Sequence, residues 1–286
     1  MTRPVTFGIQ TMLADPWDVI VSRWQWYEQQ GWDSLWLPDH LIPPTGEEGP
    51  FFEAWTALAG LAALTSRVRI GILVSSNTFR NPGVLGKMAV TVDHISHGRA
   101  ALGFGAGWFV AEHDAFGIEF PETGERVNRY GEALALLDQF VHNDTTSFEG
   151  TWYTLKNAPN RPAPVQDRLP ILVGAHGPRT IGFAARHADI WNSRGTIEEM
   201  KERNDRVTTA AQKAGRDPHA IVRSAYYNPL RTTARPWASE DAFVDWVESY
   251  REIGFTDFVF EEPLEVERSS ADQIAAELLP KLRMTG

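Results

Sequence analysis

The chain has 286 residues, of which 27 are Lys or Arg and 37 are Asp or Glu, so its formal net charge is −10. That acidic balance argues against nucleic-acid binding, which needs clustered positive charge. The sequence contains no cysteine, which excludes disulfides, thiolate catalysis and zinc–thiolate sites.

Strand patterns and helix patterns alternate along the chain. Short apolar runs typical of buried strands lie at residues 5–10, 34–40, 68–74, 100–105, 171–175, 189–192, 221–227 and 257–262. A helical pattern follows each run, at residues 15–30, 51–66, 82–95, 125–141, 178 onward, 197–214, 239–253 and 270–283. Asp15 is expected to cap the first helix, with Pro16 in its first turn. Eight strands alternating with eight helices place the chain in the α/β class and favour a closed (β/α)8 TIM barrel over an open doubly wound sheet.

One segment departs from this alternation. Residues 146–170 are predicted to form a small hairpin around Glu149-Gly150, followed by a proline-rich return. We find no internal repeat or linker, so residues 1–286 are predicted to form a single domain. The longest apolar stretch, residues 54–64, is too short to span a membrane, and the N-terminal segment lacks an apolar signal core. A cytoplasmic protein without membrane contact is expected.

The loops that follow the strands are where a barrel carries its chemistry. One of them is the run GFGAGW, in which Gly103, Gly105 and Gly107 would let the main chain approach a ligand closely. Its spacing is not that of a dinucleotide-binding fingerprint. Another is GAHGPRT, residues 174–180, where Pro178 opens a helix whose free amides could bind a phosphate. His176 and Arg179 could add side-chain donors there; the alternative is an ordinary tight turn.

The stretch RVRIGILVSSNTFRNPGVLGKMAVTVDHISHGRAALGFGAGW, residues 67–108, resembles the luciferase-like flavin and deazaflavin oxidoreductases. The resemblance runs from about Phe7 to the last helix and implies a barrel of the bacterial luciferase-like type. It also implies a non-prolyl cis peptide between Leu73 and Val74, lying behind the ring of the cofactor. Such a bond costs about 3–4 kcal/mol and persists only where the surrounding structure holds it.

The pair Asp39-His40, just past the second strand, is the predicted catalytic centre. The resemblance implies a histidine beside the ring, where an imidazole that titrates near neutrality could move a proton as hydride moves. Asp39 is expected to orient His40 or to contact the ring edge; the alternative is that both residues cap the loop. Some relatives carry a glutamate just after the glycine run, whereas Trp108 and Phe109 follow it here. This difference argues against a sugar-phosphate substrate.

We therefore expect a fairly apolar substrate pocket lined by aromatic residues, with Phe51, Trp108, Tyr226 and Tyr227 as candidates and loops 41–50 and 146–170 at its border. Together the loop positions and the resemblance predict the following cofactor-binding residues: Gln10, Asp39, Leu73, Val74, Ser75, Gly105, Ala106, Gly107, Trp108, Gly174, Ala175, His176, Gly177 and Arg179.

Three functions remain open at this stage. The favoured one is an oxidoreductase that transfers hydride between coenzyme F420, a deazaflavin, and a small organic substrate. The alternatives are an FMN-dependent monooxygenase of the same fold and a barrel that binds flavin without turnover. Glycoside hydrolysis is disfavoured, because Glu261 and Glu262 are adjacent on a strand and point to opposite faces. We expect no metal site and, as in many members of the family, a homodimer.

Overall fold

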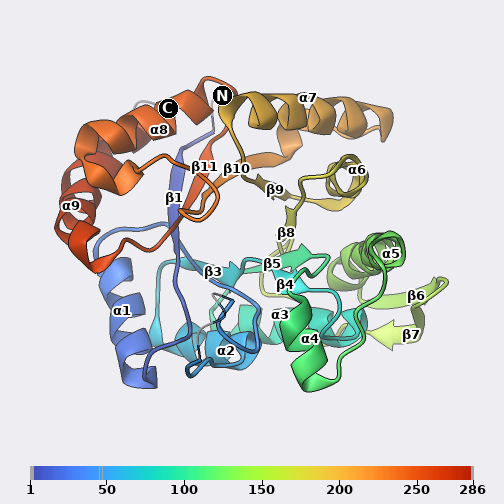
Figure 1. The fold of residues 1–286 in the computed structure, drawn as a ribbon. Helices are drawn as coiled ribbons and strands as arrows, with labels where there is room; N and C mark the ends of the chain where they lie inside the picture. Colours follow the sequence, from blue (N-terminus) through green and yellow to red (C-terminus); the bar gives the residue numbers. More distant parts are fainter. Residues whose placement is uncertain (1–2, 45, 47, 285–286) are drawn as a thin grey trace.

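The computed structural model describes residues 3–44, 46 and 48–284, and in this part of the chain the main sheet is parallel and closed (Figure 1). Its strands are β1 Thr6–Gln10, β2 Ser34–Leu37, β3 Arg69–Ile72, β4 Ser75–Ser76, β5 Ala100–Gly105, β8 Ile171–Gly174, β9 Ile190–Ser193, β10 Val222–Tyr227 and β11 Asp257–Glu261. They are ordered β3-β2-β1-β11-β10-β9-β8-β5-β4, and a further pairing of β3 with β5 closes the ring. β4 continues β3 after a break of two residues and pairs with β5. The predicted (β/α)8 barrel is confirmed.

Helices cover the outside of the barrel (Figure 1). They are α1 Trp17–Gln29, α2 Ala54–Leu64, α3 Pro82–Ile95, α4 Val110–Phe116, α5 Thr123–His142, α6 Pro178–His187, α7 Ile197–Lys213, α8 Glu240–Arg251, α9 Arg268–Gln273 and α10 Leu279–Met284. The short helical turns are η1 Pro218–Ala220, η2 Pro236–Ala238, η3 Glu265–Glu267 and the π-helical η4 Ile274–Leu278. The predicted last helix is therefore interrupted. The sequence prediction missed α4, which proves important for the site.

The start of α1 differs from the prediction. Pro16 is the N-cap residue and no side chain caps the helix. The carboxylate of Asp15 instead lies 2.5 Å from the guanidinium of Arg23, nearly two turns into the helix. An arginine within reach offers the carboxylate a charged partner, which a backbone N–H does not.

The interior of the barrel is filled by side chains from alternating strands, as the fold requires. A buried cluster consists of Trp36, Leu73, Ala101, Leu172, Ile190 and Val259. Gly71 on β3 makes room for the Trp36 ring, because a Cβ there would lie 2.6 Å from Trp36 Cζ3. These side chains fill the interior of the barrel, and one of them, Leu73, also lines the cavity described below.

The predicted hairpin forms from β6 Thr145–Glu149 and β7 Thr154–Pro159, which pair antiparallel. It lies beyond α5 at the edge of the molecule (Figure 1). None of residues 146–170 lines the cavity described below, so the expectation that this insertion borders the pocket is wrong. No helix in the described ranges is both long and apolar enough to cross a bilayer.

Candidate active site

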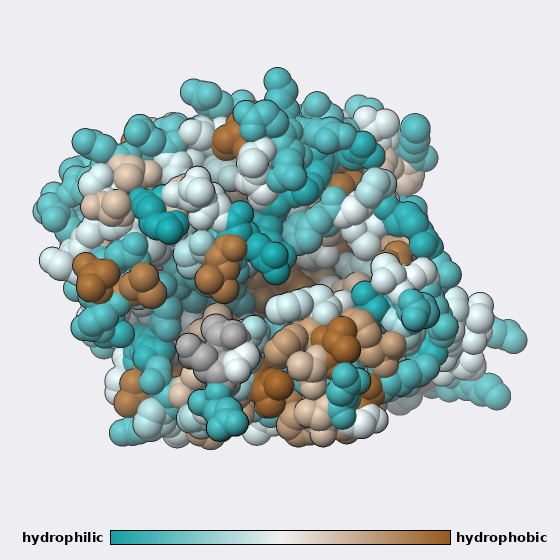
Figure 2. All heavy atoms as spheres, in the orientation of Figure 1, coloured by the Kyte–Doolittle hydropathy of each residue, from teal (hydrophilic) through white to brown (hydrophobic). Residues whose placement is uncertain are grey.

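A cavity of about 310 Å³ opens at the carboxyl ends of the barrel strands. On the face seen in Figure 1 the molecule is hollowed near its centre (Figure 2). The cavity is lined by Asp39, His40, Leu73, Val74, Ser76, Gly105, Ala106, Gly107, Trp108, Glu112, Gly174, His176, Gly177, Thr180, Asn192, Arg194 and Tyr226. Its volume is at the lower end of the range for small-molecule sites, which is about 300–1,000 Å³.

The floor of this cavity is the break between β3 and β4. The Leu73–Val74 peptide bond is cis, which confirms that prediction. Gln10 does not line the cavity; its Nε2 lies beneath the floor and donates to the Leu73 carbonyl at 2.8 Å. Ser75 does not line the cavity either, and its hydroxyl accepts a hydrogen bond from the indole of Trp55 on α2 at 3.1 Å.

The glycines around the floor have a structural role besides the predicted one. A Cβ on Gly105 would overlap Cγ2 of Val74, and one on Gly174 would lie 3.3 Å from the same atom. A Cβ on Gly103 would overlap the carbonyl oxygen of Ile72. These glycines therefore make room for the Val74 side chain and for the strand before it, and Gly105 and Gly174 also line the cavity.

Replacing Gly103 by alanine is therefore expected to destabilise the fold by about 1–3 kcal/mol, because the backbone of β3 must move to admit the methyl group. The midpoint of guanidinium unfolding measures this loss. Gly124→Ala is the matched control, since no atom lies within 4 Å of the Cβ position at Gly124. An equal midpoint for the two variants would contradict this account of Gly103.

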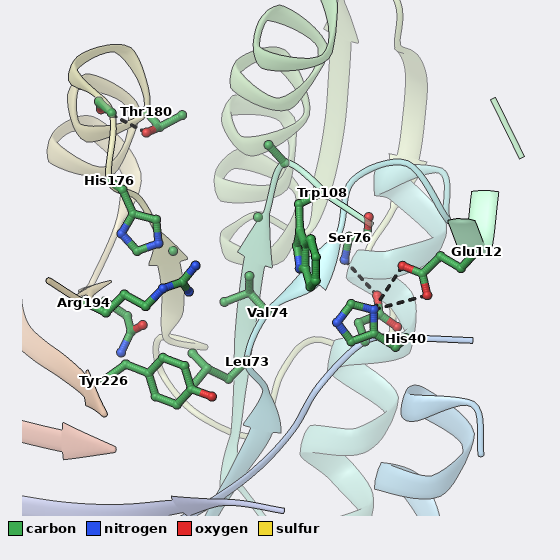
Figure 3. A pocket seen from close by; sticks show the side chains of 17 residues that line it. His40, Leu73, Val74, Ser76, Trp108, Glu112, His176, Thr180, Arg194 and Tyr226 are labelled. Carbon is green, nitrogen blue, oxygen red and sulfur yellow. Dashed lines mark hydrogen bonds and ion pairs between the residues drawn. The ribbon is translucent and has the colours of Figure 1, made fainter. Parts of the chain in front are cut away.

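His40 stands at the edge of the cavity and is held by a residue that the sequence prediction missed. Its Nδ1 lies 3.0 and 3.2 Å from the two carboxylate oxygens of Glu112 on α4 (Figure 3). Glu112 is 2% exposed and also accepts the Leu41 backbone N–H at 2.9 Å. An ionised carboxylate only accepts hydrogen bonds, so it favours the tautomer with the proton on Nδ1. Nε2 is then the nitrogen left for a substrate.

Asp39 lines the cavity, but its carboxylate binds Arg80 and not His40, so of its two predicted roles only contact with the ring edge stays a prediction. Its carboxylate accepts hydrogen bonds from Arg80 at 2.6 and 3.0 Å and from the Ser76 backbone N–H at 2.8 Å. Burial raises the pKa of Asp39, while Arg80 and the Ser76 N–H oppose that rise. Asp39 thus ties the loop after β2 to β4, beside the cis peptide.

α4 is anchored by two buried residues on consecutive positions. Glu112 binds His40, and the next residue, His113, lies 2.7 Å from Thr78 Oγ1 through its Nε2. The helix ends at Gly117, which has a φ of 64°. That glycine, seven residues after Val110, was the signal from which α4 could have been predicted.

The opposite wall of the cavity carries His176, Arg194 and Tyr226, which Figure 3 shows across Val74 from His40 and Trp108. His176 Nδ1 lies 2.8 Å from Ser193 Oγ. Burial and the neighbouring Arg194 and Arg203 lower the pKa of His176 to about 3, so its ring is neutral. Burial holds the pKa of Tyr226 well above its usual range, and its hydroxyl lies 2.9 Å from Glu261.

Besides Gln10 and Ser75, two further predicted cofactor ligands lie outside the cavity lining. Arg179 points away, and its guanidinium donates to Asn128 on α5. Ala175 is buried, and its carbonyl accepts the Trp191 indole N–H at 2.9 Å. Thr180, one residue beyond Arg179, lines the cavity in its place at the start of α6.

Two of the four aromatic residues predicted to line the substrate pocket, Trp108 and Tyr226, line the cavity. Phe51 does not line the cavity, and residues 45 and 47 of the loop 41–50 lie outside the described residues. Tyr227 lines a neighbouring cavity instead, together with three arginines. Within the described ranges no group of three or more His, Asp or Glu side chains could hold a metal ion.

Comparison with known proteins gives a consistent picture. The family model described as luciferase-like monooxygenase matches residues 4–276. An F420-dependent glucose-6-phosphate dehydrogenase of Kineococcus radiotolerans is 30% identical, and the match covers 90% of each chain. A phthiodiolone/phenolphthiodiolone dimycocerosates ketoreductase of Mycobacterium kansasii is 32% identical over 68% of this chain and 58% of its own.

Solved structures share the fold at low sequence identity. An F420-dependent secondary alcohol dehydrogenase in complex with an F420–acetone adduct superposes with a TM-score of 0.82 at 17% identity, covering 96% of this chain and all of its own. The long-chain alkane monooxygenase LadA gives a TM-score of 0.80 at 14% identity, covering 100% of this chain and 92% of its own.

Proposed function

This chain belongs to the luciferase-like monooxygenase family, and we infer that it is an oxidoreductase that uses coenzyme F420. The observation that carries this function is the cavity itself, whose floor is the cis peptide at Leu73–Val74 and whose edge holds His40 on a buried carboxylate. Relatives named for F420 dependence match 90% of the chain. The substrate is a small organic molecule. A homodimer and a cytoplasmic location stay predictions.

The residues that line the cavity fit a flat ring with a phosphate-bearing tail. The backbone of Leu73 and Val74 offers a surface without long side chains to one face of the ring. Gly177 and Thr180, at the start of α6, lie where helix amides attract a phosphate. When bound, F420 supplies or accepts a hydride at its ring.

The protein contributes a positioned proton carrier and a dry site. Glu112 holds Nδ1 of His40, so Nε2 takes the proton from a substrate hydroxyl during oxidation or returns it during reduction. The rings of Trp108 and Phe109 meet His40 edge-on at 5.5 and 5.8 Å. They shield the imidazole from solvent on the α4 side.

Glu112→Gln is expected to lower kcat by about 10- to 10²-fold with a much smaller change in KM, because the amide no longer favours one tautomer of His40. Steady-state kinetics with F420 measure this split. Asp114→Asn, an exposed carboxylate on the same helix, is the control and should behave as the wild type. A fall in thermal stability with unchanged kcat would assign Glu112 a purely structural role.

Anaerobic titration with reduced F420 and with reduced FMN, followed by absorbance, tests the choice of cofactor. We expect binding of F420 in about the micromolar range and no measurable binding of FMN. Binding of FMN alone, with product formed only when oxygen is admitted, would instead establish a monooxygenase. F420 binding without any turnover across a screen of alcohols and carbonyl compounds would favour a non-catalytic barrel.

A further inference from the structure

A separate cavity, of about 400 Å³, lies at the other end of the barrel from the candidate active site. Arg223 is the second residue of β10 and Thr256 directly precedes β11, so this cavity is at the amino ends of the two strands. The start of the chain runs beside α7 and brings Arg3 to the same place (Figure 1). The cavity shares no lining residue with the one that holds His40.

Arg223 is the buried cation of this cavity, with only 8% of its surface exposed. Its guanidinium donates four hydrogen bonds of 2.6 to 3.1 Å, and every acceptor is a neutral oxygen. The acceptors are Asn204 Oδ1, Thr208 Oγ1 and the carbonyls of Pro218 and Ile221. A guanidinium has five N–H groups, so one N–H of Nη2 is left without an acceptor in the described part of the chain.

No carboxylate balances this charge. Among the described residues no Asp or Glu lines the cavity, and none lies within 4 Å of the guanidinium of Arg223 or Arg3. Asp217 is near in sequence, but its carboxylate accepts the His219 backbone N–H at 2.9 Å. Arg3 adds a second positive charge, and its guanidinium donates to the carbonyls of His219 and Ala220 at 2.8 and 2.9 Å.

Two neighbouring cations, one of them buried, are costly to hold without an anion. Burial and the nearby Arg3 lower the pKa of Arg223 to about 10, and a guanidinium with that pKa is still charged at neutral pH. Buried charges in proteins are normally paired, because neutral carbonyls alone do not repay the loss of hydration. An anionic ligand between the two arginines would supply the missing partner.

We propose that Arg3 and Arg223 bind a phosphate group, either the free ion or one carried by a small molecule. Phosphate is favoured over a carboxylate because a dianion matches two cations and accepts from several donors at once. Thr208 and His219 line the same cavity and can donate to the remaining phosphate oxygens. The site does not depend on the F420-dependent function, since it lies outside the candidate active site.

Calorimetric titrations with inorganic phosphate and with ribose 5-phosphate, at constant ionic strength, test this site. Wild type is expected to bind at least one of them in about the millimolar range or tighter. Tighter binding of ribose 5-phosphate would identify a phosphorylated small molecule as the ligand class, and equal affinities would identify the free ion. Arg3→Gln should weaken binding by about 10-fold or more, the effect of losing one charge-assisted hydrogen bond. Arg3 is exposed, so this variant is expected to fold.

The variants locate the bound phosphate, because α6 offers the candidate active site a second place for such a group. Arg206→Gln is the matched control, since Arg206 is on α7 but pairs with Glu202 at 2.6 Å on the exposed face. Arg223→Gln should abolish binding, and Arg3→Gln decides alone if that variant does not fold. The dissociation constant of F420 should be the same in Arg3→Gln as in wild type.

Three results would overturn the proposal. One is that wild type binds neither compound. Another is that Arg3→Gln binds phosphate as well as Arg206→Gln does. The third is a parallel fall in phosphate and F420 affinity in Arg3→Gln, which would assign the phosphate to the cofactor site. Phosphate binding that depends on Arg3 in a protein that does not bind F420 would support this site and refute the cofactor assignment.

Discussion

Replacing His40 by alanine is expected to slow hydride transfer between F420 and the substrate by about 10²-fold or more. The variant loses the only imidazole that contacts Glu112 in the described part of the chain, and with it the proton carrier at the cavity edge. Because the cofactor ring would rest on Leu73 and Val74 instead, the dissociation constant of F420 should change by only a few-fold. Absorbance of F420 in single-turnover mixing measures the rate, and its titration measures the affinity.

His94→Ala provides the control for this variant. His94 is on α3, and its Nε2 contacts the Ala163 carbonyl at 2.7 Å, remote from the cavity lining. An unchanged transfer rate in His40→Ala would show that the barrel binds the cofactor without using this histidine, and it would remove the proposed role of Glu112 as well.

Replacing Arg80 by methionine is expected to lower the free energy of unfolding by about 3–5 kcal/mol, because it leaves a buried carboxylate without its cation. Arg80 donates two hydrogen bonds to Asp39, which is 4% exposed, and also contacts Glu53 at the start of α2. Denaturant unfolding measures the loss. Arg206→Met, which breaks only an exposed pair with Glu202, should cost about 0.5 kcal/mol or less.

The loss in free energy of unfolding caused by Arg80→Met should also depend on pH, in a defined direction. Burial already raises the pKa of Asp39, and removing Arg80 raises it further. The folded state then holds a proton that the unfolded state releases near its ordinary pKa of about 3.9, so stability falls as pH rises above that value. We expect the variant to be closer to wild type at pH 5 than at pH 8. A deficit that does not vary with pH would mean that Asp39 stays ionised without its partner.

Most of the fold was predictable because most of its strands and helices have a local sequence pattern. Apolar runs of strand length recur between helical patterns, and Asn81-Pro82 marks the start of α3 correctly. α4 was missed because its seven residues follow a glycine-rich run with no polar capping residue before them. The capping of α1 by Asp15 failed for a tertiary reason, since Arg23 competes for that carboxylate.

The sequence predicted which loops carry the candidate site, but not which side chains of those loops point into the cavity. The turn after β3 and the histidine after β2 were placed correctly, because strand ends in a barrel meet at one rim. Which of two neighbouring residues faces the cavity depends on packing. Thr180 lines the cavity, whereas Arg179 does not, because its guanidinium binds Asn128 on α5. The contact between His40 and Glu112 joins positions 72 residues apart, which no local pattern reveals.

The interlocking of Val74 with Gly105 and Gly174 has a consequence for how this chain can change. The side chains at these three positions occupy the same space. A larger side chain at one position therefore needs a smaller side chain at another. Gly105→Ala is expected to destabilise the fold by itself and to be tolerated together with Val74→Ala, so the double variant should be more stable than the sum of the two single losses implies. A mutant library that varies positions 74, 105 and 174 one at a time would therefore lose folded sequences that a library varying two of these positions together would contain.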